Sequence, residues 1–122
     1  MKNISDSEWK VMEVAWDMSP VLASEIVQAL IDDTNWNPKT IHTLIRRLVA
    51  KGALKAKKEK TYYLYSASIS QSECIKKEST TFIQKYFKGS FHMMITNFIN
   101  DEDLSEKDID ELQKLLDSKR GK

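Results

Sequence analysis

The stretch from Asn37 to Gly52, NPKTIHTLIRRLVAKG, constrains the fold of this chain more than any other segment. An asparagine followed by a proline is typical of a helix start, as the cap and the first helical position. Gly52 marks the end, because glycine tolerates the left-handed conformation that follows a last helical turn. Between these ends, apolar residues recur at the spacing of one helical face: Ile41, Leu44, Ile45 and Leu48. The pattern predicts an amphipathic helix that packs on a core.

The remaining surface of this predicted helix carries basic, hydroxyl and small side chains, with no acidic residue among them. These residues are Lys39, Thr40, His42, Thr43, Arg46, Arg47 and Ala50. The surrounding segment is equally biased, since residues 36–66 hold eight basic groups against Glu59 alone, a local charge of +7 in a chain of net charge +1. A local block of this kind indicates a nucleic-acid-binding surface better than the total charge does. We expect the helix to dock on a scaffold and to face a polyanion.

Two shorter helical patterns precede this helix. Ser5 and Glu8 stand at the spacing of a capping box, which predicts a first helix to about Asp17. Its aromatic and apolar face is interpreted as core packing rather than as a ligand site and contains Trp9, Met12 and Trp16. Residues 21–22 are interpreted as an apolar link to a second helix with the inward residues Ile26, Val27 and Leu30. Trp36 is expected to staple the chain to the core; the alternative is contact with a sugar-phosphate backbone.

The period changes after Gly52. Residues 54–57 and 62–65 alternate or nearly so and flank a polar turn, and the second stretch is rich in tyrosine, which predicts a β-hairpin. Three helices followed by a basic hairpin is the order of a winged helix-turn-helix, in which the third helix enters the major groove and the hairpin flanks it. The hairpin cations Lys57, Lys58 and Lys60 are interpreted as phosphate contacts; charges that only discourage edge pairing are the alternative.

From residue 70 the chain becomes helical again, with three amphipathic segments. The last begins at a capping sequence from Ser105 to Asp108. So small a region rarely buries this much apolar surface alone, and association with a second copy is the simple solution. The overall prediction is a mainly α protein with a small β-hairpin, a winged-helix domain at residues 1–68 and a helical dimerisation domain at 69–122. The residues expected to dimerise are Phe82, Tyr86, Phe91, Ile95, Phe98, Ile109, Leu112, Leu115 and Leu116.

Several classes of function are disfavoured. No apolar run has the length of a membrane span, and the N-terminus lacks a signal-peptide pattern, so we expect a cytoplasmic protein. The single Cys74 makes no internal disulfide, and with His42 and His92 it forms no cluster of metal-ligand spacing. No nucleophile and base pair or glycine-rich phosphate loop stands out. We expect no enzyme activity, no metal and no cofactor.

Four stretches together resemble the penicillinase-repressor (BlaI/MecI) family of bacterial transcriptional repressors, over most of the chain. They are SDSEWKVMEVAW, NPKTIHTLIRRLVAKG, KKEKTYYLYS and KGSFHMMITNFINDEDLSEKDIDELQKLL. The resemblance implies a winged helix that binds dyad operator DNA and a C-terminal region that forms a homodimer. For members that control β-lactam resistance it further implies cleavage, triggered by a membrane sensor, at a bond that matches Asn97-Phe98. The plain alternative is a polar Asn97 beside a core Phe98.

The resemblance also suggests which side chains read DNA. Lys39, Thr40, His42, Thr43 and Arg47 match the family's recognition helix, and Arg46 comes next. His42 stands where the family pattern has arginine, which puts the usual operator sequence in question. A copper-responsive branch carries a cysteine cluster that this chain lacks, so copper sensing is disfavoured. A winged-helix adaptor that binds another protein is the alternative from a different class, and the basic block argues against it.

Overall fold

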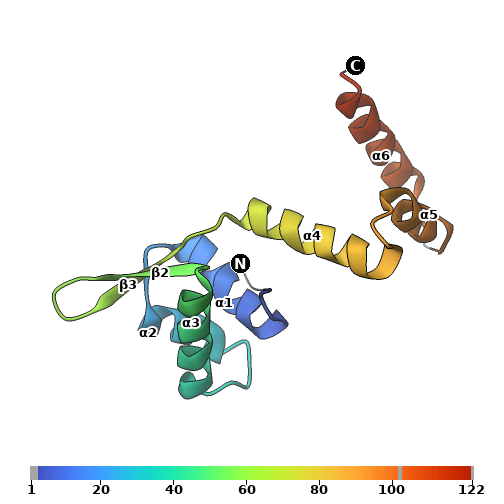
Figure 1. Ribbon diagram of the computed structural model, residues 1–122. Coiled ribbons are helices and arrows are strands. Elements are labelled where there is room, and N and C mark those ends of the chain that lie inside the picture. The colour runs from blue at the N-terminus through green and yellow to red at the C-terminus, as the bar shows by residue number, and fades with distance from the viewer. Residues whose placement is uncertain (1–2, 102, 122) are drawn as a thin grey trace. The chain divides into compact units, whose positions relative to one another are not determined.

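The computed structural model describes residues 3–101 and 103–121. Helices dominate, and a small sheet forms within residues 21–67 (Figure 1). The elements in chain order are α1 (Asp6–Met18), β1 (Val21–Leu22), α2 (Ala23–Ile31), α3 (Pro38–Lys51), β2 (Leu54–Lys58), β3 (Tyr63–Ala67), α4 (Gln71–Phe87), α5 (Phe91–Asp101) and α6 (Glu106–Lys119). The predicted fold class, mainly α with a β-hairpin in a winged helix-turn-helix, is confirmed.

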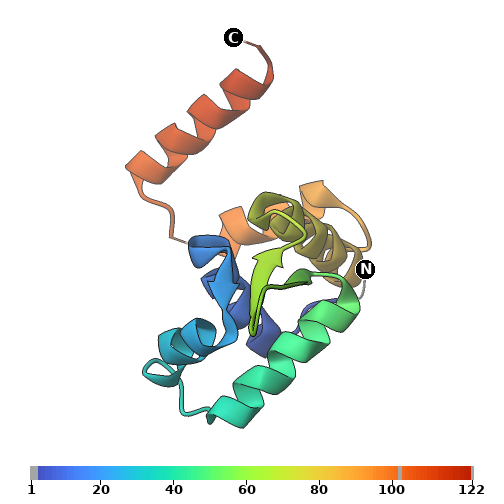
Figure 2. The same cartoon turned by 90° about the vertical axis from the view of Figure 1, so that its left-hand side faces the viewer.

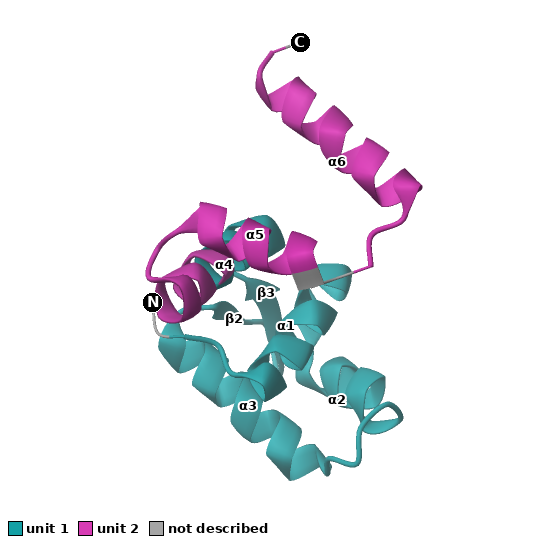
Figure 3. Cartoon of the chain, turned by 90° about the vertical axis from the view of Figure 1, so that its right-hand side faces the viewer, with its two compact units in different colours: residues 1–78 teal, residues 79–122 magenta. Residues whose placement is uncertain are grey.

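The chain divides into two compact units, residues 1–78 and 79–122 (Figure 3). The first unit takes in the beginning of α4, because Cys74 is buried in its core and Ile69 packs against that core. The functional boundary expected between residues 68 and 69 stays a prediction.

The sheet of the first unit has three antiparallel strands in the order β1-β3-β2. β2 and β3 form the predicted hairpin, with Lys58 opposite Tyr63, and the hairpin extends beyond the helices (Figure 1). The interpretation of residues 21–22 as a simple link was wrong, since Val21 lies opposite Tyr65 in the sheet. This third strand pairs with Leu64 and Tyr65 of β3 and leads directly into α2.

The helices of this unit begin and end where local signals place them. Asn37 Oδ1 accepts from the Thr40 backbone N–H at 2.9 Å at the start of α3, and Gly52 closes it with φ of 82°. Ser5 and Glu8 form the predicted capping box of α1. Figure 2 looks along the hairpin and shows α2 and α3 joined by a short turn.

One hydrophobic core holds the first unit together. It takes the predicted faces of the three helices, including Met12, Ile26 and the whole stripe of α3, which is buried. Trp9 and Trp16 are only partly buried, pack edge to face with centroids 5.2 Å apart, and Trp16 Nε1 donates to the Ile69 carbonyl at 2.9 Å. Trp36 also packs partly buried against the core, which confirms the staple.

The second unit is built differently. Its described side chains, at residues 79–100 and 103–121, include none that is buried. Apolar side chains of α4, α5 and α6 are instead exposed, among them Phe82, Tyr86, Phe91, Ile95, Phe98, Ile109, Leu112, Leu115 and Leu116. Exposed apolar surface of this extent is unusual for a free monomer. Among residues 3–101 and 103–121, no helix is both long and apolar enough to cross a bilayer.

Candidate nucleic-acid interface

The buried stripe of α3 fixes which of its side chains face solvent. With the stripe in the core, the helical period places Lys39, Thr43, Arg46 and Ala50 on the opposite side. The remaining predicted readers lie on the two flanks, His42 on one and Thr40 and Arg47 on the other. All of these side chains are exposed except Thr43, which is half-buried. The structure therefore brings the six predicted residues of this helix onto one outward surface.

Hydrogen bonds organise part of this surface. Thr40 Oγ1 donates to Asn37 Oδ1 at 3.2 Å, within the helix cap. Thr43 Oγ1 donates to the Lys39 carbonyl one turn earlier, at 3.0 Å. The same Thr43 oxygen accepts from Arg46 Nη2 at 3.2 Å. The two threonines therefore use their hydroxyl groups differently: Thr40 bonds a cap side chain, and Thr43 bonds a backbone carbonyl and Arg46.

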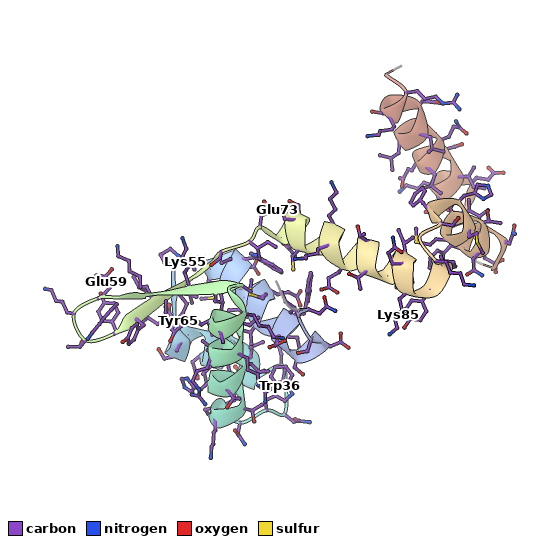
Figure 4. All side chains as sticks on the ribbon, in the orientation of Figure 1. Trp36, Lys55, Glu59, Tyr65, Glu73 and Lys85 are labelled. Carbon is purple, nitrogen blue, oxygen red and sulfur yellow. The ribbon has the colours of Figure 1, made fainter. Side chains whose placement is uncertain are left out.

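The hairpin supplies a second cationic surface. Lys57, Lys58 and Lys60 are all exposed, as predicted for a hairpin tip. Lys57 lies 3.8 Å from Glu59, a weak and solvated pair that leaves the surface positive. In Figure 4, Lys55 projects from β2, and Glu59 lies near the tip of the hairpin.

A shallow apolar groove separates α3 from the sheet, and sequence reasoning missed it. Arg46, Val49 and Ala50 of α3 line one side, and Ala56, Tyr63 and Tyr65 of the hairpin line the other. The only available signal was the spacing of Tyr63 and Tyr65, which places both rings on one face of a strand. Arg46 thus lies on the helix at the border with the hairpin.

An ion pair anchors the end of α3, and it was also missed. Lys51 Nζ contacts Glu8 Oε1 at 2.5 Å and donates to the Asn3 carbonyl at 2.8 Å. The Glu8 side chain is 2% exposed. One of the eight cations in the basic segment is therefore used inside the fold and is less available to a polyanion.

Several groups act on the Glu8 carboxyl. Burial raises its pKa, but hydrogen bonds from Lys51 and from Ser5 outweigh burial, so its pKa lies below the ordinary value of 4.5. Ser5 donates its backbone N–H to Glu8 Oε1 at 2.8 Å. The second carboxylate oxygen, Oε2, is buried and has no hydrogen-bond donor among the described residues. The carboxylate is held ionised by Lys51, which makes the pair a structural element.

Other candidate sites have little chemistry to offer. Burial and the charge of Glu78 raise the pKa of the Cys74 thiol, so it stays protonated and unreactive at neutral pH. Within residues 3–101 and 103–121, no three His, Cys, Asp or Glu side chains gather in a way that would hold a metal ion. Asn97 and Phe98 lie within α5, and both are exposed.

Three helices, a β-hairpin wing and an outward cationic third helix define a winged helix-turn-helix protein of the DNA-binding class. The sequence model of the penicillinase repressors matches residues 4–118, and the chain belongs to the penicillinase-repressor family.

Individual relatives support this assignment. The penicillinase repressor of Bacillus licheniformis is 34% identical over 119 residues, which span 98% of this chain and 93% of that repressor. The methicillin resistance regulatory protein MecI of Staphylococcus aureus strain N315 is 38% identical over 116 residues, 95% of this chain and 94% of MecI. The fold is also similar to the solution structure of monomeric Bacillus licheniformis BlaI in complex with the blaP half-operator, with a TM-score of 0.53. The two sequences are 39% identical over the matched region, which covers 59% of this chain and 88% of that one.

Proposed function

We propose that this protein is a transcriptional repressor that binds dyad operator DNA as a homodimer in the cytoplasm. The observation that carries the proposal is the acid-free outward surface of α3 beside a cationic hairpin. A third helix with such a surface fits the major groove, and hairpin cations fit the flanking phosphates. The complex of BlaI with its half-operator supports the same use of the domain. Lys39, Thr40, His42, Thr43, Arg46 and Arg47 are assigned to the groove, and Lys57, Lys58 and Lys60 to phosphates.

The proposed homodimer rests on the second unit. Its described part buries no side chain, while the apolar faces of α5 and α6 line an open groove that includes Ile99, Ile109, Leu112 and Leu116. Two copies that cover these faces would also place two α3 helices on the two halves of a symmetric operator.

Replacing Arg47 with alanine should weaken operator binding by about 1–3 kcal/mol, the usual cost of a lost specific contact. Fluorescence anisotropy with the duplex that the full-length chain selects from a randomised pool measures this loss. Lys10→Ala, an exposed cation on α1, is the matched control and should change the affinity by no more than about 0.5 kcal/mol. Equal affinities of Arg47→Ala and the wild type would remove Arg47 from the reading surface.

The hairpin cations provide a contrasting variant. Replacing Lys57, Lys58 and Lys60 with glutamine should lower affinity for all duplexes alike and flatten its salt dependence, because phosphate neutralisation releases counterions. An adaptor that binds another protein would select no duplex and show no such dependence. This pair of measurements separates the two classes of function.

Inactivation by proteolysis at Asn97-Phe98, in a pathway with a membrane sensor that responds to β-lactams, is the regulatory part of the proposal. The exposure of both side chains and the family membership support it. In its host, exposure to a β-lactam should then yield a fragment that ends at Asn97, detected by mass spectrometry. The doubly substituted Asn97→Ala/Phe98→Ala chain should stay whole. Derepression with an intact wild-type chain would rule out this signal.

A further inference from the structure

The hydrogen bonds on the outward side of α3 assign the two atoms at the end of the Thr43 side chain to different tasks. A threonine hydroxyl has one proton to donate and two lone pairs. In Thr43 the proton goes to the Lys39 carbonyl, and one lone pair accepts from Arg46 Nη2. The hydroxyl is therefore largely engaged within the helix. The methyl group is the part of this side chain that remains for an external partner.

The bond to Lys39 also fixes the direction of the methyl group. Threonine occupies staggered rotamers, and a hydroxyl that bonds the carbonyl four residues earlier selects among them. With the hydroxyl directed back along the helix, the methyl position follows. Thr40 is arranged differently, because its hydroxyl donates to the cap residue Asn37 and nothing described donates to it. Its oxygen remains an acceptor toward bases, so the two threonines are not equivalent readers.

The hydrogen bond from Arg46 Nη2 to Thr43 Oγ1 restrains the long Arg46 side chain. A free arginine samples many rotamers, and ordering it on binding costs conformational entropy. One Nη2–H bond to Thr43 restricts Arg46 before DNA arrives and leaves its other donors open. Arginine with two free donors is the side chain that most often reads guanine, through O6 and N7.

We propose that Thr43 reads a thymine of the operator through its methyl group, while its hydroxyl positions Arg46 to read a guanine in a neighbouring base pair. The thymine 5-methyl group is the only apolar group on a base edge in the major groove, and a methyl side chain is its natural partner. This inference rests on the proposed function, because it concerns the same helix surface.

Base analogues test the methyl contact. The probe is the duplex selected by the full-length chain, with each thymine replaced in turn by uracil, which lacks only the methyl group. Thr43→Val keeps a methyl and loses the hydroxyl, whereas Thr43→Ser keeps the hydroxyl and loses the methyl. At one thymine per half-site, uracil should weaken binding by the wild type and Thr43→Val about fourfold, the value of one buried methyl group. Thr43→Ser should bind both duplexes equally.

The positioning of Arg46 has a separate readout. Replacing a guanine beside that thymine with 7-deazaguanine removes the N7 acceptor and should weaken wild-type binding. The loss should persist in Thr43→Ser, which keeps the hydroxyl, and should shrink in Thr43→Val. A uracil penalty that survives in Thr43→Ser, the absence of any sensitive thymine, or equal 7-deazaguanine losses in both variants would overturn the inference. Failure to select any duplex would instead overturn the proposed function.

Discussion

Replacing Lys51 with methionine should lower the free energy of unfolding of the first unit by about 3 kcal/mol at pH 7, the cost of leaving a buried charge without its partner. Methionine keeps the hydrocarbon stem in place and removes the ammonium group that contacts Glu8 Oε1. The Glu8 carboxylate, on a side chain that is 2% exposed, would then retain only the Ser5 backbone N–H as a donor. Urea denaturation followed by circular dichroism measures the loss.

The pH dependence of this effect distinguishes it from lost packing. In the wild type the folded-state pKa of Glu8 lies below 4.5, so the unfolded chain binds the proton more readily. Stability from this group is present above that pH and is lost as the pH falls through the folded-state pKa. Without Lys51, burial should raise the folded-state pKa of Glu8, and the sign reverses. The Lys51→Met variant should therefore recover part of its deficit as the pH is lowered toward 4.5.

Two further variants serve as controls. Glu8→Gln/Lys51→Met removes both charges and keeps an acceptor for the Ser5 N–H, so it should regain most of the stability. Lys57→Met breaks the exposed pair with Glu59 and should cost less than about 1 kcal/mol. A Lys51→Met deficit independent of pH, or a double variant no more stable than the single one, would show that the ion pair contributes little.

Local signals explain why most of the first unit could be predicted from the sequence. The cap at Asn37, the left-handed Gly52 and the stripe of α3 each involve residues within a few positions of one another, and each is confirmed. Strand β1 carries no such signal, because two residues cannot show a period and Val21 pairs with the distant Tyr65. A short strand of this kind is defined by its partner.

The composition of the candidate site was predictable, and its contacts were not. Lys51 looks like any other cation of the basic segment, since its partner Glu8 stands 43 positions earlier, in a capping box that already accounts for it. Likewise, Thr40 and Thr43 are the same residue on the same helix, and the sequence does not show that their hydroxyl groups bond to different partners. Side-chain contacts of this kind depend on the folded backbone.

The amphipathic segments of the second unit were also predictable, but none of its side chains at residues 79–100 and 103–121 is buried. The predicted faces carry exposed aromatic and aliphatic side chains instead of a core. An amphipathic pattern indicates that one face of a helix will be buried, but it does not identify the surface that covers that face. In the proposed homodimer, a second copy of the chain would bury these faces.

Replacing Leu112 with aspartate should abolish the proposed dimer and lower affinity for the full dyad operator by about 100-fold or more, because two linked reading helices gain that factor by avidity. Leu112 is 43% exposed and lines the apolar groove between α5 and α6, beside Ile109 and Leu116. A carboxylate buried there without a cation would oppose association. Sedimentation equilibrium measures the mass, and anisotropy compares the dyad with a single half-site.

The half-site separates loss of association from loss of reading. Affinity for one half-site should remain unchanged in Leu112→Asp, because α3 and the hairpin belong to the other compact unit. Lys114→Asp is the matched control, since it places the same residue in α6 on the side opposite the apolar stripe. It should remain dimeric and keep its dyad affinity. If Leu112→Asp stays dimeric, or loses affinity for the half-site and the dyad alike, the exposed stripe of α6 does not join the two copies.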